Sequence, residues 1–227
     1  MRCSLVKNVV IFDLDGTLVD TSAGILNSVK DTVSHFGLSP LTDSELITFM
    51  GGSIYESFKR FYPETDSVAL VDYFRERYTE VHFEEAQPYE GIYGLLEKLY
   101  EDGVTVGVAT FKREDLANRL LSSYTFYKHI HCICGSDSEG ILKKTDIINN
   151  CLQLLNVKDK RDVLFVGDAP NDALSAKMVG VSFLGVAYGY GFKTEEEVYK
   201  LHSHGSFAER VIDIYNVIKQ NYYSHES

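Results

Sequence analysis

Short apolar segments rich in β-branched residues alternate along most of the chain with amphipathic segments of helical length. The apolar segments lie at 8–12, 104–109, 129–134, 163–166 and 181–186. The helical segments lie at 91–101, 114–123, 145–155 and 172–180, and weaker patterns indicate a last strand at 208–212 and a last helix at 214–220. Because nearly continuous apolar strands that alternate with helices form parallel βαβ units, we predict an α/β fold with a doubly wound (Rossmann-like) parallel sheet.

One long stretch interrupts this alternation. Residues 21–87 show only helical patterns, which lie at 23–35, 43–50, 54–61 and 68–83 and are separated by glycines and prolines. We therefore predict a core domain formed by 1–20 and 88–227, with an α-helical cap domain inserted at 21–87. The insertion follows the carboxyl end of the first strand, where open α/β sheets bind ligands, so we expect the cap to act as a lid.

The net negative charge of the chain argues against one class of partner, nucleic acids. Asp and Glu total 33 against 22 Lys and Arg, a formal net charge of −11 at pH 7. Because such a surface repels a phosphate backbone, we expect no nucleic-acid partner.

The sequence also lacks signals for a membrane. No apolar run approaches the roughly 20 residues that span a bilayer, and the N-terminus lacks a signal-peptide pattern. We expect a cytoplasmic protein without a membrane partner, and its oligomeric state is not readable from the sequence.

Two aspartates come directly after the first predicted strand. Asp13 and Asp15 are two residues apart, which places both side chains on one face of an extended chain. Carboxylates at the end of a buried apolar strand cost stability unless a cation or a reaction uses them, and Gly16 permits a tight turn just after them. Strand-end Asp residues also cap loops, but paired buried carboxylates favour a functional role.

A second pair of aspartates follows a later strand. Asp168 lies at the end of the strand at 163–166, and Asp172 lies at the start of the next helix. Asp172 alone would be an ordinary helix cap, but Asp168 beside Asp13 would be repulsive without a cation. Because this set of hard oxygen ligands lacks the His or Cys that zinc prefers, we predict a Mg²⁺ site.

Two weaker signals stand near other strand ends. Thr110 follows the strand at 104–109, where its hydroxyl can bond to a phosphate oxygen. Lys143 and Lys144 open the helix at 145–155, where either ammonium can reach the same phosphate. A strand-end Thr or a helix-start Lys is usually an ordinary surface feature, but their order along the chain adds weight to both.

These four groups of residues, in this order, resemble the motifs of the haloacid dehalogenase (HAD) superfamily. The resemblance covers most of the chain and is greatest to phosphoglycolate phosphatase-like hydrolases with a helical cap. Segments 49–54 and 57–58 resemble a cap loop of that subgroup, 88–91 resembles its return to the core, and 188–191 resembles a late loop.

The resemblance implies a role for each motif residue in the reaction. Asp13 would be the nucleophile that forms an aspartyl-phosphate, and Asp15 the general acid/base. Thr110 and Lys144 would bind the transferring phosphoryl group, and Lys144 is preferred over Lys143 because its surroundings look more like the family's helix start.

The resemblance also implies the ligands of Mg²⁺. Asp13, the backbone carbonyl of Asp15 and Asp168 would hold the ion, with Asp172 as a further ligand or as a support. The second motif departs from the family pattern at two positions. Phe111 stands where Asn or Ser is frequent, which puts a polar role there in doubt, and Arg113 stands where proline is common.

Three alternative functions are compatible with this site, and we favour the first. We expect a hydrolase, a Mg²⁺-dependent phosphomonoesterase acting on a small phosphorylated metabolite such as a phosphoglycolate-like compound or a nucleoside monophosphate. A phosphosugar mutase of the β-phosphoglucomutase kind would share the aspartyl-phosphate, but such mutases often differ where Thr17 stands. A phospho-accepting signalling module is less favoured, because receivers place the acceptor on a middle strand and have no large helical insertion.

Cysteine and histidine residues raise the question of a second metal site. The four cysteines, at 3, 132, 134 and 151, are too few and too scattered for a disulfide framework, so we expect reduced thiols. His129, His131, Cys132 and Cys134 could suggest zinc. In a strand, however, the histidines and cysteines would face opposite ways, so we disfavour it. We expect His202 and His204 to lie in a solvated loop.

Overall fold

The chain divides into two compact units. The computed structural model describes residues 9–50, 53–137 and 141–223, and only the backbone of 220–223. One unit, here called the core unit, contains Met1–Val19 and Pro88–Ser227; the other, the inserted unit, is Asp20–Gln87. The chain passes between the units at a small two-stranded sheet formed by β2 (Val19–Asp20) and β3 (Gln87–Pro88).

The core unit is built on a six-stranded sheet with the order β5-β4-β1-β6-β7-β8, in which each neighbouring pair is parallel. Its strands are β1 (Val9–Phe12), β4 (Thr105–Arg113), β5 (Cys132–Ser136), β6 (Val163–Gly167), β7 (Ser182–Val186) and β8 (Ser206–Ala208). Every residue of β1 is buried, as expected for a strand covered on both faces. The predicted doubly wound α/β fold is confirmed.

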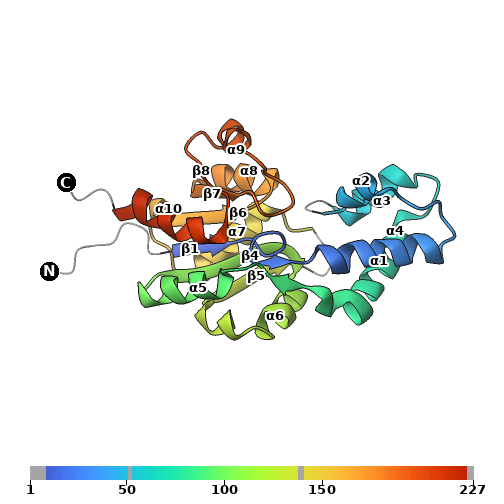
Figure 1. The fold of residues 1–227 in the computed structure, drawn as a ribbon, viewed down its shortest axis with the longest axis horizontal. Coiled ribbons are helices and arrows are strands. Elements are labelled where there is room, and N and C mark those ends of the chain that lie inside the picture. The colour runs from blue at the N-terminus through green and yellow to red at the C-terminus, as the bar shows by residue number, and fades with distance from the viewer. Residues whose placement is uncertain (1–8, 51–52, 138–140, 224–227) are drawn as a thin grey trace. The chain divides into compact units, whose positions relative to one another are not determined.

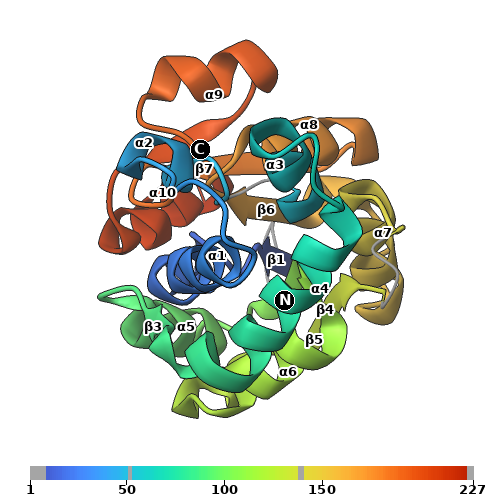
Figure 2. The ribbon, with the colours of Figure 1, turned by 90° about the vertical axis from the view of Figure 1, so that its right-hand side faces the viewer.

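Helices cover both faces of this sheet (Figure 2). They are α5 (Ile92–Glu101), α6 (Glu114–Ser122), α7 (Lys144–Leu154), α8 (Pro170–Val179), α9 (Glu195–Leu201) and α10 (Val211–Tyr223), with short 3₁₀ turns η3 (Thr125–His129) and η4 (Lys160–Asp162). On one face α7 packs on β4 and β5, and α8 packs on β6 and β7; α5 and α10 pack together on the other side. The chain winds from β1 outward to β5 and then returns to β6, so the winding reverses beside β1.

The inserted unit is helical (Figure 1). Its elements are α1 (Ser22–His35), α2 (Asp43–Ile47), α3 (Ile54–Phe61), α4 (Ser67–Arg77), a π turn η1 (Tyr78–His82) and a 3₁₀ turn η2 (Phe83–Glu85). Thr42 and Glu45 form a capping box at the start of α2, and the Asp66 side chain caps α4. Phe49, Phe58 and Leu70 are buried in its core.

Several element boundaries differ from the sequence prediction because local hydrogen bonds favour turns. The strand predicted at 129–134 begins only at Cys132, since η3 extends as far as His129. The strand predicted at 208–212 ends at Ala208, and Asp213 accepts from the Arg210 side chain at the start of α10. The helix predicted at 43–50 ends at Ile47, and the one predicted at 68–83 gives way to η1 and η2.

Parts of the predictions concern residues outside the described ranges. Cys3 and the Gly51-Gly52 part of the cap-loop motif are among them. Within 9–50, 53–137 and 141–223, no helix has the combination of length and apolar character that crossing a bilayer requires.

Candidate active site

Three carboxylates meet at the carboxyl edge of the sheet, where β1 and β6 end. Phe12 of β1 pairs with Val166 of β6, and the backbone N–H of Asp13 donates to Val166 O over 2.8 Å. Asp13 and Asp168 follow these strands directly, while Asp172 lies in the first turn of α8. One oxygen from each carboxylate lies within 4.8 Å of the others, and all three residues are buried.

Lys144, the first residue of α7, joins two of these carboxylates. Its Nζ lies 2.8 Å from Asp13 Oδ1 and 3.0 Å from Asp172 Oδ1, and its side chain is 2% exposed. Burial lowers the pKa of Lys144, but the charges of Asp13 and Asp172 outweigh it and raise the pKa above its ordinary value. Lys143 is exposed. The structure therefore selects Lys144 as the lysine that enters the site.

One ammonium does not balance three carboxylates, and their pKa values reflect this. Burial raises the pKa of Asp13 to about 7, although Lys144 opposes the rise. Burial and the charge of Asp13 raise the pKa of Asp168 to about 6. Burial also raises the pKa of Asp172, again against the effect of Lys144. Ionising all three carboxylates is therefore unfavourable in free energy, and a bound cation would offset this.

The loop after β7 holds Asp168 in place. Asp168 Oδ2 accepts from the backbone N–H of Tyr190 at 2.6 Å and of Gly191 at 3.3 Å. Asp168 Oδ1 accepts from the Thr17 hydroxyl at 3.2 Å. The motif at 188–191 was noted in the sequence, but its role as a hydrogen-bond donor to Asp168 was not predicted.

Gly16 lies against the same carboxylate. Its φ is +82°, and a Cβ at this position would lie 2.5 Å from Asp168 Oδ2. The backbone therefore needs glycine here both for its conformation and for the close approach. The turn that contains it is closed by Leu14 O, which accepts from the N–H groups of Leu18 and Val19.

Asp15 forms an ion pair with Lys112 that was not predicted from the sequence. Lys112 Nζ lies 2.9 Å from Asp15 Oδ1, and the two side chains are 7% and 22% exposed. Lys112 stands two residues after Thr110 in β4. That spacing is the signal that could have found it, because alternate residues of an extended strand share a face.

Thr110 lies at the same edge of the sheet by register. It is two residues beyond Val108, which pairs with Phe12, and it is 1% exposed. Its Oγ1 accepts from the backbone N–H of Lys112 at 3.1 Å. Among the described residues, no hydrogen bond joins the Thr110 side chain to the three carboxylates, so its role as a phosphate ligand stays a prediction.

The two departures from the family pattern have different surroundings. The exposed ring of Phe111 lies beside the site, with its centroid 5.4 Å from Lys144 Nζ, so an aromatic face replaces a polar side chain there. Arg113 instead forms a bidentate ion pair with Asp115 at the start of α6.

The structure separates the cysteines of the second metal candidate from its histidines, as the sequence predicted. Within the described residues, Cys132, Cys134 and Cys151 come together without a histidine. The His131 ring instead accepts from the backbone N–H of Val106 at 3.1 Å through Nδ1. Cys132, Cys134 and Cys151 are free thiols in this structure.

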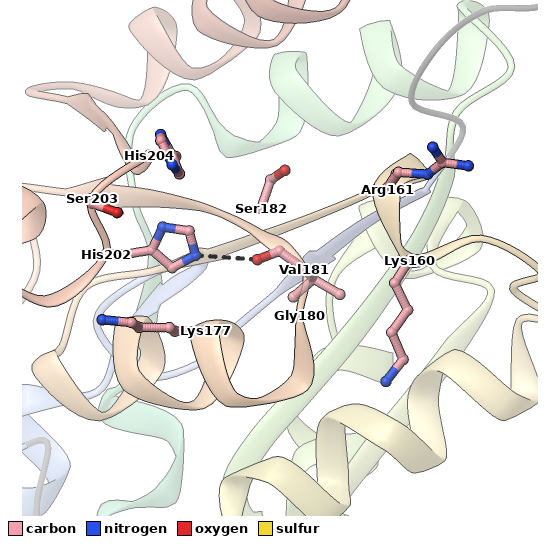
Figure 3. A pocket seen from close by; sticks show the side chains of 9 residues that line it. All are labelled: Lys160, Arg161, Lys177, Gly180, Val181, Ser182, His202, Ser203 and His204. Carbon is pink, nitrogen blue, oxygen red and sulfur yellow. Dashed lines mark hydrogen bonds between the residues drawn. The ribbon is translucent and has the colours of Figure 1, made fainter.

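The prediction of a solvated loop holds for His204, which is exposed, but is wrong for His202. Its ring is buried, and its Nε2 lies 3.2 Å from Val181 O (Figure 3). Burial lowers the pKa of His202. It lines a cavity of about 410 Å³ together with Lys160 and Lys177. This cavity lies where β6 and β7 begin, at the sheet edge opposite the carboxylates.

Comparison with known proteins gives consistent matches. A family model described as haloacid dehalogenase-like hydrolase matches residues 10–186. A 5′-nucleotidase from Pseudomonas aeruginosa is 32% identical over 189 residues, covering 82% of this chain and 85% of that protein. A phosphoglycolate phosphatase from Agrobacterium fabrum is 33% identical over 189 residues, covering 79% and 80%. A haloacid dehalogenase-like family hydrolase of known structure from Streptococcus pneumoniae has a TM-score of 0.86 at 25% identity, covering 93% of this chain and 98% of that chain.

Proposed function

Because this chain belongs to the haloacid dehalogenase-like hydrolase family, as its motifs predict, we propose that it is a Mg²⁺-dependent phosphomonoesterase of small phosphorylated metabolites. The observation that carries this proposal is the convergence of three buried carboxylates and one lysine at the carboxyl edge of the sheet. Relatives named 5′-nucleotidase and phosphoglycolate phosphatase support a nucleoside monophosphate or a phosphoglycolate-like substrate.

The donor set at this edge fits Mg²⁺. It consists of hard carboxylate oxygens, with more negative charge than Lys144 can offset. Asp13, Asp168 and the backbone carbonyl of Asp15 would hold the ion. When bound, the ion supplies positive charge that offsets the carboxylates and an anionic phosphate.

Asp172 holds Lys144 in position. Its Oδ1 contacts Lys144 Nζ at 3.0 Å, and its Oδ2 accepts from the backbone N–H of Ala169 at 3.1 Å. With both oxygens engaged, Asp172 positions Lys144 rather than serving as a principal metal ligand. Lys144 and the Thr110 hydroxyl then bind the oxygens of the transferring phosphoryl group.

The reaction proceeds in two displacements at phosphorus. In the first, an Asp13 carboxylate oxygen attacks, the bond from phosphorus to the leaving oxygen breaks, and Asp15 gives its proton to that oxygen. In the second, Asp15 takes a proton from water while the water oxygen attacks the aspartyl-phosphate, which releases phosphate and restores Asp13. Lys144 keeps positive charge next to the reacting group throughout.

The test is phosphate release from a panel of phosphoglycolate, nucleotides, sugar phosphates and phosphoamino acids, with and without Mg²⁺. Asp13→Asn removes the nucleophile with little change of volume, and we expect it to abolish turnover. Asp72→Asn is the matched control, because Asp72 is an exposed carboxylate in α4 of the inserted unit. Normal turnover by Asp13→Asn would contradict the proposal.

The same panel separates the alternatives. Sugar-phosphate isomerisation with little release of phosphate would indicate a mutase instead. A phosphoenzyme that persists for minutes without turnover would indicate a signalling module.

A further inference from the structure

Three cysteine thiols outside the carboxylate site meet where α7 packs against β4 and β5. Cys132 and Cys134 belong to β5 and Cys151 belongs to α7, and their Sγ atoms all lie within 4.8 Å of one another. The Sγ atoms of Cys132 and Cys151 are 3.2 Å apart. We infer that Cys132 and Cys151 form an oxidation site, which closes to an intramolecular disulfide when a peroxide oxidises the reduced protein.

The surrounding backbone leaves space for this pair. Gly107 of β4 faces the two thiols, and a Cβ at this position would lie 2.7 Å from Cys151 Sγ and 3.3 Å from Cys132 Sγ. Any larger residue in this central part of β4 would therefore displace one of the two sulfurs. The glycine therefore leaves room beside β4 for the sulfurs of β5 and α7 to approach each other.

Exposure sets the order in which the thiols react. Cys151 is fully buried and Cys134 is 2% exposed, whereas Cys132 is half-buried. A small oxidant therefore reaches Cys132 first. Hydrogen bonds from the thiols of Cys134 and Cys151 also lower the pKa of Cys132, so its reactive thiolate form is favoured.

The chemistry is a two-electron oxidation of two thiols. The Cys132 thiolate attacks a peroxide oxygen, the O–O bond breaks, and hydroxide leaves to give a sulfenic acid. The Cys151 sulfur then attacks the Cys132 sulfur, its proton passes to the departing oxygen, and water leaves. In total, two thiols and one hydrogen peroxide give one disulfide and two waters.

Backbone geometry favours Cys151 over Cys134 as the partner. Cys132 and Cys134 are two residues apart in a strand, which separates their backbone positions by about 6.6 Å. Their Cβ atoms point the same way at a similar spacing, whereas a disulfide needs them about 3.8 Å apart. Cys132 and Cys151 belong to separate elements and their Sγ atoms already lie 3.2 Å apart, and a bridge between them would tie β5 to the helix that begins with Lys144.

The experiment uses the full chain, reduced and then freed of reductant. Hydrogen peroxide is added at a few molar equivalents, remaining thiols are alkylated in denaturant, and a digest is mapped by mass spectrometry. We expect a linked peptide pair that contains Cys132 and Cys151 and that disappears after reduction. Cys134→Ser should retain this pair, whereas Cys151→Ser should lose it and leave Cys132 to oxidise further to the sulfinic acid.

Several outcomes would overturn the inference. One is a Cys132 that reaches the sulfinic acid in the unmodified chain while Cys151 stays a free thiol. Another is a dominant link from Cys132 to Cys134 or to Cys3. Stoichiometric zinc or copper in the purified chain, lost in Cys132→Ser, would show that the thiols are metal ligands instead. Cys132→Ser is the variant of choice if Cys151→Ser does not fold, because the Cys132 side chain is only half-buried.

Discussion

Lys112 Nζ lies 2.9 Å from Oδ1 of Asp15, and the lysine side chain is almost fully enclosed. The proposed general acid/base is therefore held by an ion pair from the neighbouring strand β4, two residues beyond Thr110. Such a pair fixes the orientation of the Asp15 carboxyl group, and small displacements of a reacting group are costly to catalysis.

Replacing Lys112 with methionine keeps most of the side-chain volume and removes this ion pair. Because Asp15 then loses its orienting partner, we expect kcat to fall by about tenfold or more, equivalent to about 1.4 kcal/mol. Steady-state kinetics on the best substrate of the panel measures the change. Arg113→Met is the matched control, since Arg113 pairs with Asp115 instead. Equal losses in both variants would argue against a role for Lys112 at Asp15.

Replacing Lys144 with methionine leaves the buried carboxylates of Asp13 and Asp172 without their cation. We expect the free energy of unfolding to fall by about 3–5 kcal/mol without Mg²⁺, as for other broken buried ion pairs. Added Mg²⁺ should restore part of the loss, because it binds the same carboxylates. Urea unfolding with and without Mg²⁺ measures both effects, and Lys143→Met serves as the exposed control. A stability that does not respond to Mg²⁺ would count against a metal at this edge.

The stabilisation by Mg²⁺ should depend on pH. Asp13 and Asp168 have pKa values raised to about 7 and about 6, above the ordinary value of 3.8. The folded metal-free protein therefore holds protons that the unfolded chain has lost, so these groups lower stability as pH rises from about 4 to about 7. Mg²⁺ needs the ionised carboxylates, and we expect its effect on the melting temperature to be larger near pH 8 than near pH 5. Equal shifts at both pH values would contradict the expectation.

Gly16→Ala should weaken metal binding. The added Cβ would meet the Asp168 carboxylate and would also require a positive φ. We expect Mg²⁺ affinity, measured by calorimetry, to fall by about tenfold or more because Asp168 must move. Gly103→Ala separates the two causes: Gly103 has φ +74° but nothing within 4 Å of its added Cβ. It should therefore lose about 1 kcal/mol of stability through backbone strain and keep its Mg²⁺ affinity.

His82 of the inserted unit should contribute stability that is lost at high pH. Its Nδ1 lies 2.7 Å from Glu85 and its Nε2 lies 3.1 Å from Asp31. Burial lowers the pKa of His82, but these carboxylates raise it above its ordinary value of 6.5. The contribution is therefore complete below about pH 6.5 and disappears as pH rises through the higher folded pKa. We expect His82→Gln to lose about 1 kcal/mol at pH 6 and much less at pH 9, as measured by thermal unfolding. The same loss at both pH values would indicate a packing effect instead.

The amino-acid sequence was enough to predict the fold class and the polar residues at the strand ends. The alternation of apolar and helical segments is a local pattern, and parallel strands place their carboxyl ends at one edge, so Asp13 and Asp168 could be predicted to meet there. Element boundaries were less accurate. The strand expected at 129–134 begins three residues late, because a 3₁₀ turn of local hydrogen bonds competes with pairing to β4.

Which side chains contact one another could not be predicted from the sequence, because it depends on how the elements pack. Lys143 and Lys144 are adjacent in sequence, and the rotation of α7 against the sheet sends only Lys144 toward Asp13 and Asp172. The same packing places Cys151 over Gly107 beside Cys132. The spacing from Thr110 indicates which face of β4 carries Lys112, but its pairing with Asp15 depends on the packing of β4 beside β1. Periodicity describes one segment at a time, whereas these contacts depend on the register and rotation with which separate segments pack.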